Sequence, residues 1–224
     1  MTREEFFQKS QSSFASVSDL VYEYLRENII QMQLLPGTQL NESRLSAELK
    51  VSRTPVRAAI HRLETEGLAT LGYSKAATVS PLKRSEYYQI AEFRAAVEGR
   101  AAYHAAKLIS AEALAQLKDI LIDMERGDKS QVIYPLNEDR FHTLIVHSAQ
   151  NPFFNAAYEL YRSKLFRYRW YLFVEFPIVD EYSLTVRTMT HRAIYNALKN
   201  HYSEQAQEES IADALLMRNT SLSL

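Results

Sequence analysis

The sequence predicts a mainly α-helical protein with an N-terminal winged helix-turn-helix, including a small β wing, followed by a C-terminal antiparallel all-helical bundle. Three observations predict this class. A short basic amphipathic helix is expected near residues 55–66, two short strand-like runs follow it, and apolar residues recur at helical spacing from residue 85 onwards. With 224 residues, of which 46% are hydrophobic, the chain is long enough for two modest domains with their own cores.

Composition limits the functions open to the chain. The net charge of −1 means that affinity for nucleic acid must come from local basic patches rather than from the whole molecule. No cysteine is present, which excludes disulfides and thiolate metal sites. No apolar run approaches the roughly 20 residues that span a bilayer, and the N-terminus lacks the apolar core of a signal peptide. We therefore expect a soluble, cytoplasmic protein without a membrane partner.

Four segments are expected along the chain. Residues 1–15 are polar apart from three phenylalanines and are interpreted as a flexible N-terminal arm. Residues 16–80 form the predicted winged helix-turn-helix domain, which starts with a helix whose apolar residues recur at every fourth position. Residues 81–84 contain a proline and are interpreted as a linker. Residues 85–224 form the predicted helical domain.

The basic helix has two different faces. Val56, Ile60 and Leu63 recur at i, i+4 and i+7 and form one apolar stripe. Thr54 is suited to cap this helix and Pro55 to occupy its first position, where a missing N–H has no intrahelical partner. The opposite face carries Lys50, Arg53, Arg57 and Arg62. Such a face is often only a solvated surface, which is the alternative to DNA binding.

Two neighbouring patterns favour DNA binding. Leu45 and Leu49 form a second short apolar stripe that ends just before the basic helix, as in a helix-turn-helix. Downstream, Gly67 closes the basic helix and residues 69–79 read as a hairpin. We interpret this hairpin as a wing with Lys75 at its tip, a candidate for contact with DNA.

These residues resemble the winged helix-turn-helix of GntR-family transcription regulators. The resemblance spans roughly residues 17–79 and depends above all on the run SRTPVR at residues 52–57. It implies that DNA is contacted by Ser52, Arg53, Thr54 and Arg57. Arg44 is a further candidate, because the arginine that touches DNA in some relatives falls on Ser43 here. Ala76 stands where the family often has glycine, which is a departure in the wing.

From residue 85 onwards the helical pattern breaks at only a few places, which predicts six helices in an antiparallel bundle. The helix after Asn151-Pro152 is strongly aromatic. Its rings suit an ordinary hydrophobic core, which is one interpretation. The interleaved Arg162, Arg167 and Arg169 also suit a pocket for an anionic ligand, which is the other.

Histidine and carboxylate spacing in this bundle is typical of a metal site. Glu138 and His142 lie at i and i+4, so they share one face of a helix. His191 and Asp213 belong to two later helices. Histidines in helices are more often solvated or hydrogen-bonded than bound to metal, and this alternative stands beside the metal site.

The same region resembles the all-helical FCD effector domain of the FadR subfamily. Arg94 and Glu98, residues 138–142 and residues 191–198 carry the resemblance. Many members bind a divalent metal through four positions, which correspond here to Glu138, His142, His191 and Asp213. The resemblance therefore implies Zn²⁺, Ni²⁺ or Mn²⁺, all suited to imidazole and carboxylate ligands. Asp139 is the substitute ligand if the helix register differs by one.

The FCD resemblance also implies a small-molecule effector. We expect a small carboxylate, with the metal binding one end and Arg94 the other. In the alternative, Arg94 and Glu98 form an ordinary i, i+4 ion pair on the surface.

Together these features predict a ligand-responsive transcription regulator, expected to be a repressor, whose homodimer binds an inverted repeat in double-stranded DNA. Effector binding would change its affinity for DNA. Three alternatives remain: a metal-independent regulator with an arginine and aromatic pocket, a metal-dependent enzyme, and a structural DNA-binding module with an inactive pocket. Regulation accounts for both domains together, so we expect no enzymatic activity.

Overall fold

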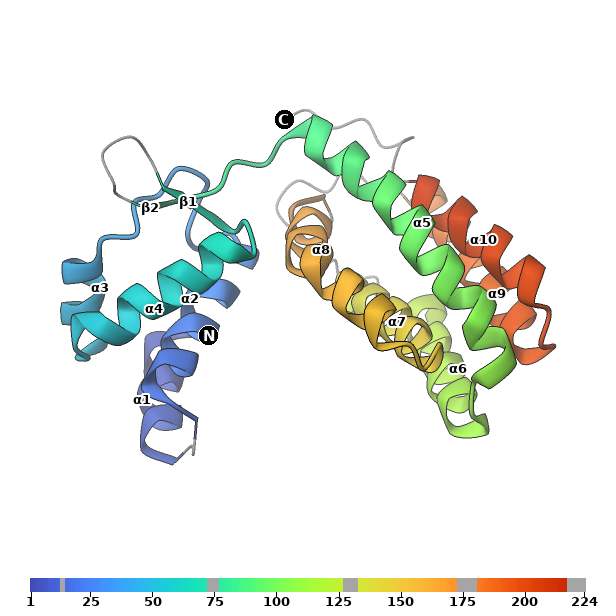
Figure 1. Ribbon diagram of the computed structural model, residues 1–224, viewed down its shortest axis with the longest axis horizontal. Helices are drawn as coiled ribbons and strands as arrows, with labels where there is room; N and C mark the ends of the chain where they lie inside the picture. Colours follow the sequence, from blue (N-terminus) through green and yellow to red (C-terminus); the bar gives the residue numbers. More distant parts are fainter. Residues whose placement is uncertain (13–14, 72–76, 127–132, 173–180, 217–224) are drawn as a thin grey trace. The chain divides into compact units, whose positions relative to one another are not determined.

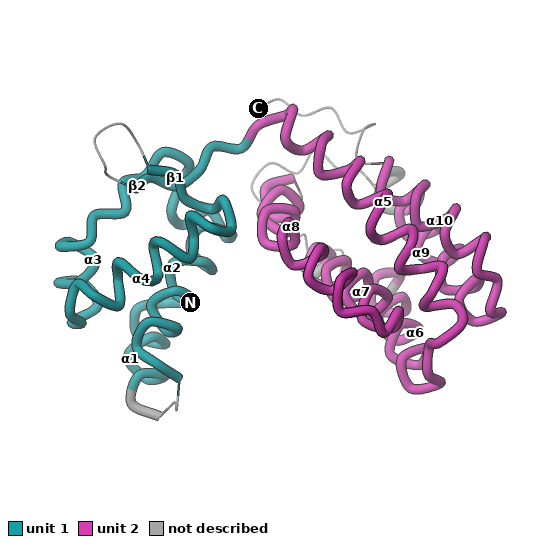
Figure 2. The backbone as a smooth tube through the Cα atoms, viewed as in Figure 1, with its two compact units in different colours: residues 1–82 teal, residues 83–224 magenta. Residues whose placement is uncertain are grey.

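The computed structural model describes residues 1–12, 15–71, 77–126, 133–172 and 181–216. Two compact units make up the chain, residues 1–82 and residues 83–224 (Figure 2). The first unit contains four helices and a two-stranded sheet among the described residues, and the second contains six helices. This arrangement confirms the fold class predicted from the sequence, mainly helical with a small β wing.

The first unit holds the helix-turn-helix and the wing strands. Its elements are α1 (Arg3–Ser12), α2 (Val17–Ile30), α3 (Glu42–Leu49), α4 (Arg53–Thr65), β1 (Ala69–Leu71) and β2 (Ala77–Val79) (Figure 1). The two strands are antiparallel, with Ala69 paired to Val79 and Leu71 to Ala77. Lys75, expected at the tip of the wing, lies outside the described residues.

Polar caps determine where the helices around the helix-turn-helix begin. The side chain of Ser16 accepts a hydrogen bond from the backbone N–H of Asp19 and starts α2. The side chain of Asn41 accepts one from the backbone N–H of Arg44, at 2.9 Å, and starts α3. Lys50 follows α3 in the left-handed region, with φ of 53°, and turns the chain toward α4.

The start of α4 differs from the sequence interpretation. Ser52 occupies the N-cap position and Arg53 is the first helical residue, so Thr54 is not the cap and Pro55 is the third residue rather than the first. Proline still fits at this position, because the first four N–H groups of a helix lack intrahelical partners. The helix therefore exposes one more arginine at its positive end than a start at Pro55 would give.

The apolar stripe predicted for α4 faces the core of the first unit. Val56 and Leu63 are fully buried, and Ile60 is nearly so. They belong to one hydrophobic cluster with Leu25 and Ile29 of α2. Packing of α4 on α2 leaves the basic side of α4 at the surface.

The N-terminal segment is not the flexible arm expected for residues 1–15, since most of it is the helix α1. Phe6 is fully buried in the same hydrophobic cluster. Its ring meets that of Tyr24 in α2 at 5.7 Å between centroids, in an edge-on arrangement. The helix therefore forms part of the core of the first unit.

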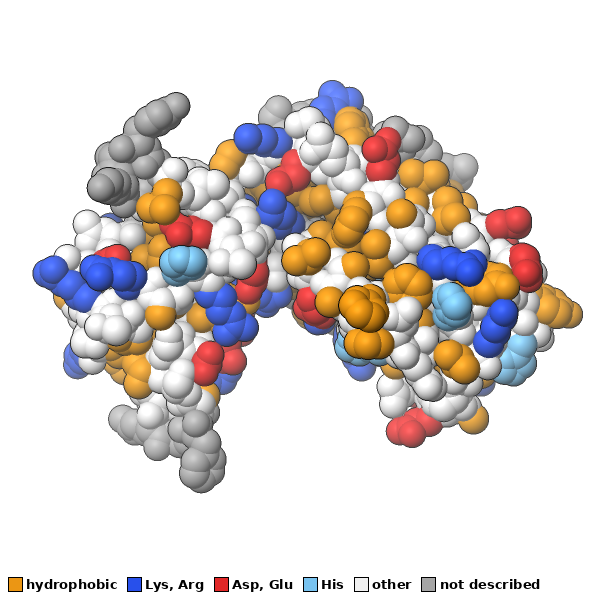
Figure 3. Space-filling view, in the orientation of Figure 1, with side chains coloured by type: hydrophobic (Ala, Val, Ile, Leu, Met, Phe, Trp, Pro, Cys, Tyr) orange, Lys and Arg blue, Asp and Glu red, His pale blue; other side chains and the backbone are white. Residues whose placement is uncertain are grey.

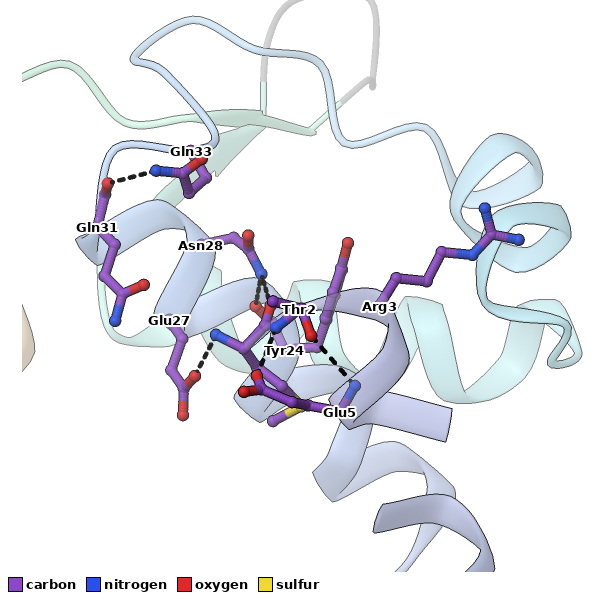
Figure 4. Close-up of a pocket in the computed structure, with 9 residues that line it drawn as sticks. Thr2, Arg3, Glu5, Tyr24, Glu27, Asn28, Gln31 and Gln33 are labelled. Atoms are coloured by element: carbon purple, nitrogen blue, oxygen red, sulfur yellow. Dashed lines mark hydrogen bonds and ion pairs between the residues drawn. The ribbon is translucent and has the colours of Figure 1, made fainter. Parts of the chain in front are cut away.

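A reciprocal cap starts α1. The backbone N–H of Thr2 donates to Glu5 Oε2 at 2.7 Å, and the backbone N–H of Glu5 donates to Thr2 Oγ1 at 3.2 Å. Both residues line a pocket of about 550 Å³ beside α2 (Figure 4). Asn28 of α2 also donates to the carbonyl of Met1 at 3.0 Å, which ties the two helices together.

The second unit is an all-helical bundle. Its elements are α5 (Arg84–Leu108), α6 (Ala111–Arg126), α7 (Ile133–Ser148), α8 (Pro152–Trp170), α9 (Glu181–Lys199) and α10 (Ser203–Leu216). The six helices agree with the number predicted, and Arg84, assigned to the linker 81–84, is already the first residue of α5. None of the helices in the described parts of the chain is long and apolar enough to cross a membrane.

Close packing of α5 on α10 brings their polar residues together. The two helices run side by side (Figure 1). A Cβ atom at Gly99 would lie 2.6 Å from Ile211 Cγ1, so a larger residue there would force Ile211 to move. At this separation, Arg94 of α5 reaches Asp213 of α10, with 3.3 Å between Nη2 and Oδ2.

Candidate nucleic-acid interface and candidate metal centre

The exposed end of α4 collects the residues expected to contact DNA. Ser52, Arg53, Thr54 and Arg57 are all exposed at the N-terminal end of this helix. Backbone N–H groups without intrahelical partners and the positive end of the helix dipole lie at the same place. Such an end is suited to anions, phosphate groups included.

Two of the candidate arginines are held by acidic residues of α3. Arg57 forms a two-pronged ion pair with Glu42, through Nε to Oε1 at 2.9 Å and Nη2 to Oε2 at 2.8 Å. Arg44 pairs with Glu48 of its own helix at 2.7 Å. The hydrogen bonds from Arg57, followed by its charge, hold the pKa of Glu42 below its usual value. The sequence analysis did not single out Glu42, although an acidic residue in the first turn of α3 was visible.

A cluster of buried polar residues lies inside the second unit, and we call it the buried polar centre. Its members come from α5, α7, α9 and α10 and are at most 3% exposed: Arg94, Glu98, Glu138, His142, His191 and Asp213. Charged groups are rarely buried unless they are paired or bind metal. The centre is therefore the strongest candidate for a site in this unit.

Three of the four predicted metal ligands converge within the centre. His142 Nε2 lies 3.2 Å from His191 Nε2 and 3.3 Å from Asp213 Oδ2. His191 Nε2 lies 3.5 Å from Asp213 Oδ1. Ligand atoms about 2.0–2.2 Å from a tetrahedral ion are roughly 3.3 Å apart, so these three donors fit one divalent ion. Among the described residues, His142, His191 and Asp213 are the group of acidic and histidine side chains whose ligand atoms lie close enough together to bind one metal ion.

The burial of His191 and the hydrogen bonding of His142 suit metal ligands. Burial lowers the pKa of His191 to about 4, more than the nearby carboxylates raise it, so the imidazole is neutral near pH 7. His142 Nδ1 lies 3.1 Å from Glu98 Oε2. With its proton on Nδ1 donated to Glu98, His142 has its lone pair on Nε2. Arg94 Nη2 lies 3.3 Å from this atom, so a metal bound there would replace that contact.

Glu98 holds Arg94, Tyr161 and His142 in place within the buried polar centre. Arg94 Nε and Nη2 donate to its two oxygens at 2.8 and 3.0 Å, and the Tyr161 hydroxyl donates to Oε1 at 2.9 Å. Burial would raise the pKa of Glu98, but the charge of Arg94, together with the hydrogen bonds from Arg94 and His142, outweighs it and holds the pKa well below its usual value. The Arg94–Glu98 pair is thus buried, and the surface pair proposed as an alternative is wrong.

Glu138 stands beside the three convergent donors. Its Oε1 is 3.9 Å from His191 Nε2, while its Oε2 accepts from Arg169 Nε at 2.8 Å. Asp139, the substitute ligand, is instead paired with Arg162 at 2.7 Å. The i, i+4 spacing therefore places Glu138 near the histidines, but Arg169 competes for it.

The predicted effector arginines occupy three different settings. Arg94 is enclosed by Glu98, His142 and Asp213 within the centre. Arg162 is only half buried and binds Asp139 and Glu159, away from the histidines. Arg167 and Arg169 lie on α8 and are buried.

Both buried arginines of α8 have guanidinium nitrogens without a hydrogen-bond partner. These atoms are Nε and Nη2 of Arg167 and Nη1 and Nη2 of Arg169, in the part of the chain that the structure describes. Burial lowers the pKa of Arg167 to about 10. Unpaired buried guanidinium groups have strong affinity for anions, and Arg169, through Glu138, adjoins the histidines.

Two family models match the chain. The model described as bacterial regulatory proteins, gntR family, matches residues 18–79, and the FCD domain model matches residues 89–213. The first match contains the exposed end of α4. The second contains all six residues of the buried polar centre.

Curated relatives are named as transcription regulators. The Nta operon transcriptional regulator of Aminobacter aminovorans is 35% identical over 117 residues, 52% of this chain and 56% of that protein. The HTH-type transcriptional repressor RspR of Escherichia coli strain K12 is 30% identical over 137 residues, 59% of each chain. A regulator from the TAR-I ttuE-ttuC′ intergenic region of Agrobacterium vitis is 32% identical over 63% of this chain and 85% of its own. The chain thus spans under two thirds of the length of the first two.

Solved structures share the fold. Escherichia coli McbR/YncC superposes with a TM-score of 0.72 at 22% identity, covering 92% of this chain and 96% of that one. A GntR regulator from Rhodococcus sp. RHA1 gives a TM-score of 0.69 at 20% identity, covering 93% of this chain and all of that one, 100%. At these identities the likeness concerns the fold alone.

Proposed function

Because the chain belongs to the GntR family of bacterial regulatory proteins and carries an FCD domain, we propose that it represses transcription by binding an inverted-repeat operator as a homodimer. A small carboxylate bound in the second unit, with a divalent metal, controls its affinity for that operator. The domains and named relatives that it matches are transcription regulators, so it is a regulator of this type and not an enzyme. Such a protein acts in the cytoplasm.

The exposed basic end of α4 is the observation that carries the proposal for DNA. Arg53 and Arg57 read base edges in the major groove, because the arginine fork matches the acceptors of guanine. Ser52 and Thr54 hold phosphates together with the free N–H groups of the helix start. Arg44 of α3 adds a phosphate contact beside this surface. Lys75, which lies outside the described residues, is proposed as a DNA contact from the sequence alone.

An exposed apolar stripe on the second unit supports a homodimer. Phe153 and Leu160 lie seven residues apart on α8 and are 83% and 72% exposed, and Phe93 of α5 is 44% exposed. The ring of Phe93 packs edge-on against Tyr161 of α8, so this exposed residue of α5 belongs to the contact between the two helices. Hydrophobic side chains also gather over this part of the second unit in Figure 3. A second copy covering the patch would pair two recognition helices about a two-fold axis.

The buried polar centre supports the metal. His142, His191 and Asp213 would hold a Zn²⁺, Ni²⁺ or Mn²⁺ ion, with Glu138 as a fourth donor once it leaves Arg169. Glu98 would keep His142 in the required tautomer. While Glu138 stays with Arg169, the three converging donors would leave one tetrahedral position for a carboxylate oxygen of the effector. With Glu138 bound as well, an open position would require an ion with more than four ligands.

Arg169 favours a second form of the same proposal, in which the effector binds without metal. Its Nη1 and Nη2 atoms have no hydrogen-bond partner among the described residues, although the side chain is only 4% exposed. A carboxylate ligand would supply the missing acceptors. In this form Arg94 holds Asp213, and neither histidine binds a metal.

The DNA proposal is tested with Arg57→Ala. The operator is first selected from random duplexes with the wild-type protein, and affinities for it and for an unrelated duplex are then measured at fixed salt. Loss of a base contact should cost roughly 1–3 kcal/mol of discrimination between the two. Equal losses on both duplexes would show that Arg57 touches phosphate only.

The metal proposal is tested by elemental analysis of untagged protein purified without chelators. We expect about one divalent ion per chain in the wild type and none in a His142→Ala/His191→Ala variant. A His61→Ala/His147→Ala variant, which changes two exposed histidines outside the centre, should keep its ion. Metal-free wild-type protein that still binds a carboxylate would favour the arginine form.

A further inference from the structure

The ion pair between Glu42 and Arg57 connects the first turn of α3 to the exposed face of α4. The carboxylate is the more enclosed partner, with its side chain 32% exposed against 71% for Arg57. Asn41 caps α3 immediately before Glu42. The carboxylate of Glu42 thus projects from a capped helical turn. Because the arginine side chain is longer and more exposed, Glu42 determines the position of Arg57 in this pair.

The contact uses one edge of the guanidinium group. Nε and Nη2 of Arg57 each donate to a different oxygen of Glu42. Arginine has five N–H donors in a planar fork, so the donors on Nη1 and the second one on Nη2 remain. The side chain of Arg57 is 71% exposed, so this free edge is accessible to DNA, and such an edge matches the paired acceptors of guanine.

The negative charge of Glu42 has a second consequence at this surface. An arginine free to move binds any phosphate within reach, which raises affinity for every sequence and carries no sequence information. A carboxylate bound to the same guanidinium group removes part of that attraction. An exposed ion pair adds little to stability, so its effect should be seen in recognition rather than in folding.

We propose that Glu42 is a positioning residue for DNA recognition: it holds Arg57 in the direction that reads a base and restrains it from binding phosphates of any sequence. This inference rests on the proposed role of Arg57. It assigns to an acidic residue of α3 a share of the specificity of α4.

The test compares Glu42→Gln with Glu64→Gln. Both residues line one pocket of about 400 Å³ beside Arg57, and each change removes one negative charge. Glu64 has no ion pair among the described residues, so Glu64→Gln reports the effect of charge alone. Affinities are measured for the selected operator and for an unrelated duplex at several salt concentrations.

We expect Glu42→Gln to bind the unrelated duplex more tightly and to lower the ratio of operator to unrelated affinity about fivefold or more. Its salt dependence on the unrelated duplex should steepen by about 0.9, the value for one added phosphate contact. Glu64→Gln should change both affinities alike and leave the ratio unchanged. The inference is overturned if the two variants give the same ratio.

Two further variants separate geometry, charge and the role of Arg57. Glu42→Asp keeps the charge but is one methylene shorter, so it should also lower the ratio; a ratio equal to the wild type would indicate charge alone and overturn the inference. Arg57→Ala tests the proposal beneath it. If Arg57→Ala leaves the ratio intact, the role of Arg57 is wrong; if it lowers the ratio and Glu42→Gln does not, only the positioning role is wrong.

Discussion

The hydroxyl oxygen of Tyr168 accepts a hydrogen bond from the backbone N–H of Lys83 at 2.8 Å, at the residue where the second unit begins. The same hydroxyl lies 2.8 Å from Glu86 Oε2, to which it donates. The next residue of α8, Arg169, binds Glu138 beside the buried polar centre. Two consecutive residues of one helix thus contact the start of α5 and the candidate effector site.

This relationship predicts that Tyr168→Phe weakens the response of DNA binding to ligand. The centre is untouched by the change, so Zn²⁺ should still bind with the same stoichiometry. The start of α5 loses its tie to α8, so the ratio of operator affinities with and without Zn²⁺ should move toward one. Both quantities are measurable on the full chain by calorimetry and by a DNA-binding titration.

The matched control for this prediction is Tyr158→Phe. Tyr158 is another buried tyrosine of α8, and among the described residues its hydroxyl has one long contact, of 3.4 Å with Thr143. This variant should respond to Zn²⁺ as the wild type does. A Tyr168→Phe protein with an undiminished response would show that α8 does not couple the site to the start of α5.

The buried ion pairs of the second unit predict unequal effects on stability. Glu98→Gln removes the carboxylate that neutralises most of the charge of the fully buried Arg94. We therefore expect the free energy of unfolding to fall by about 3–5 kcal/mol. Asp139→Asn breaks the partly exposed pair with Arg162, whose loss should cost about 1 kcal/mol. Denaturant unfolding followed by circular dichroism measures both. Equal losses would contradict the dominant role assigned to burial.

The helix α1 was not predicted from the sequence. A polar composition suggested an arm, yet Thr2 and Glu5 have the T-x-x-E spacing of a reciprocal helix cap. That signal was present in the sequence. The burial of Phe6 could not be predicted in this way. It depends on the packing of α1 against α2, and a local sequence pattern does not encode a tertiary contact.

The buried polar centre shows a similar division. Helical spacing placed Glu138 and His142 on one face, and the resemblance to FCD domains added His191 and Asp213. Of these four residues, His142, His191 and Asp213 converge in the structure. Spacing within a helix did not reveal that Arg169 of another helix holds Glu138. The separation of the four residues along the chain carries no information about which neighbouring cations compete for them.

Tyr22 predicts a pH dependence of stability in the alkaline range. Burial, and then its hydrogen bond to Glu66, raise the pKa of Tyr22 to about 12. Because the unfolded chain loses this proton near pH 10, the contribution is complete below pH 10 and is lost as pH rises through 12. Two pKa units correspond to about 2.7 kcal/mol. The charged groups next to the hydroxyl, Glu66 and the exposed Arg62, are reached by solvent, whose screening reduces this to about 1 kcal/mol.

The measurement for Tyr22 is the free energy of unfolding between pH 9 and pH 12, compared between the wild type and Tyr22→Phe. Since lysines also titrate in this range, only the difference between the two proteins isolates Tyr22. That difference should shrink as pH rises. Tyr202→Phe, at an exposed position, should track the wild type throughout, and a constant difference for Tyr22→Phe would contradict the assignment.

The apolar stripe of α8 predicts that Leu160→Asp produces a monomer. Leu160 is 72% exposed, so the change should not disturb the folded chain, but a buried carboxylate at a dimer interface is costly. Light scattering after size-exclusion chromatography should give half the wild-type mass, and operator affinity should fall because one recognition helix then binds one half-site. Met189→Asp, at a position 66% exposed on α9, is the control and should stay dimeric. A Leu160→Asp protein that is still dimeric would place the interface on another face of the second unit.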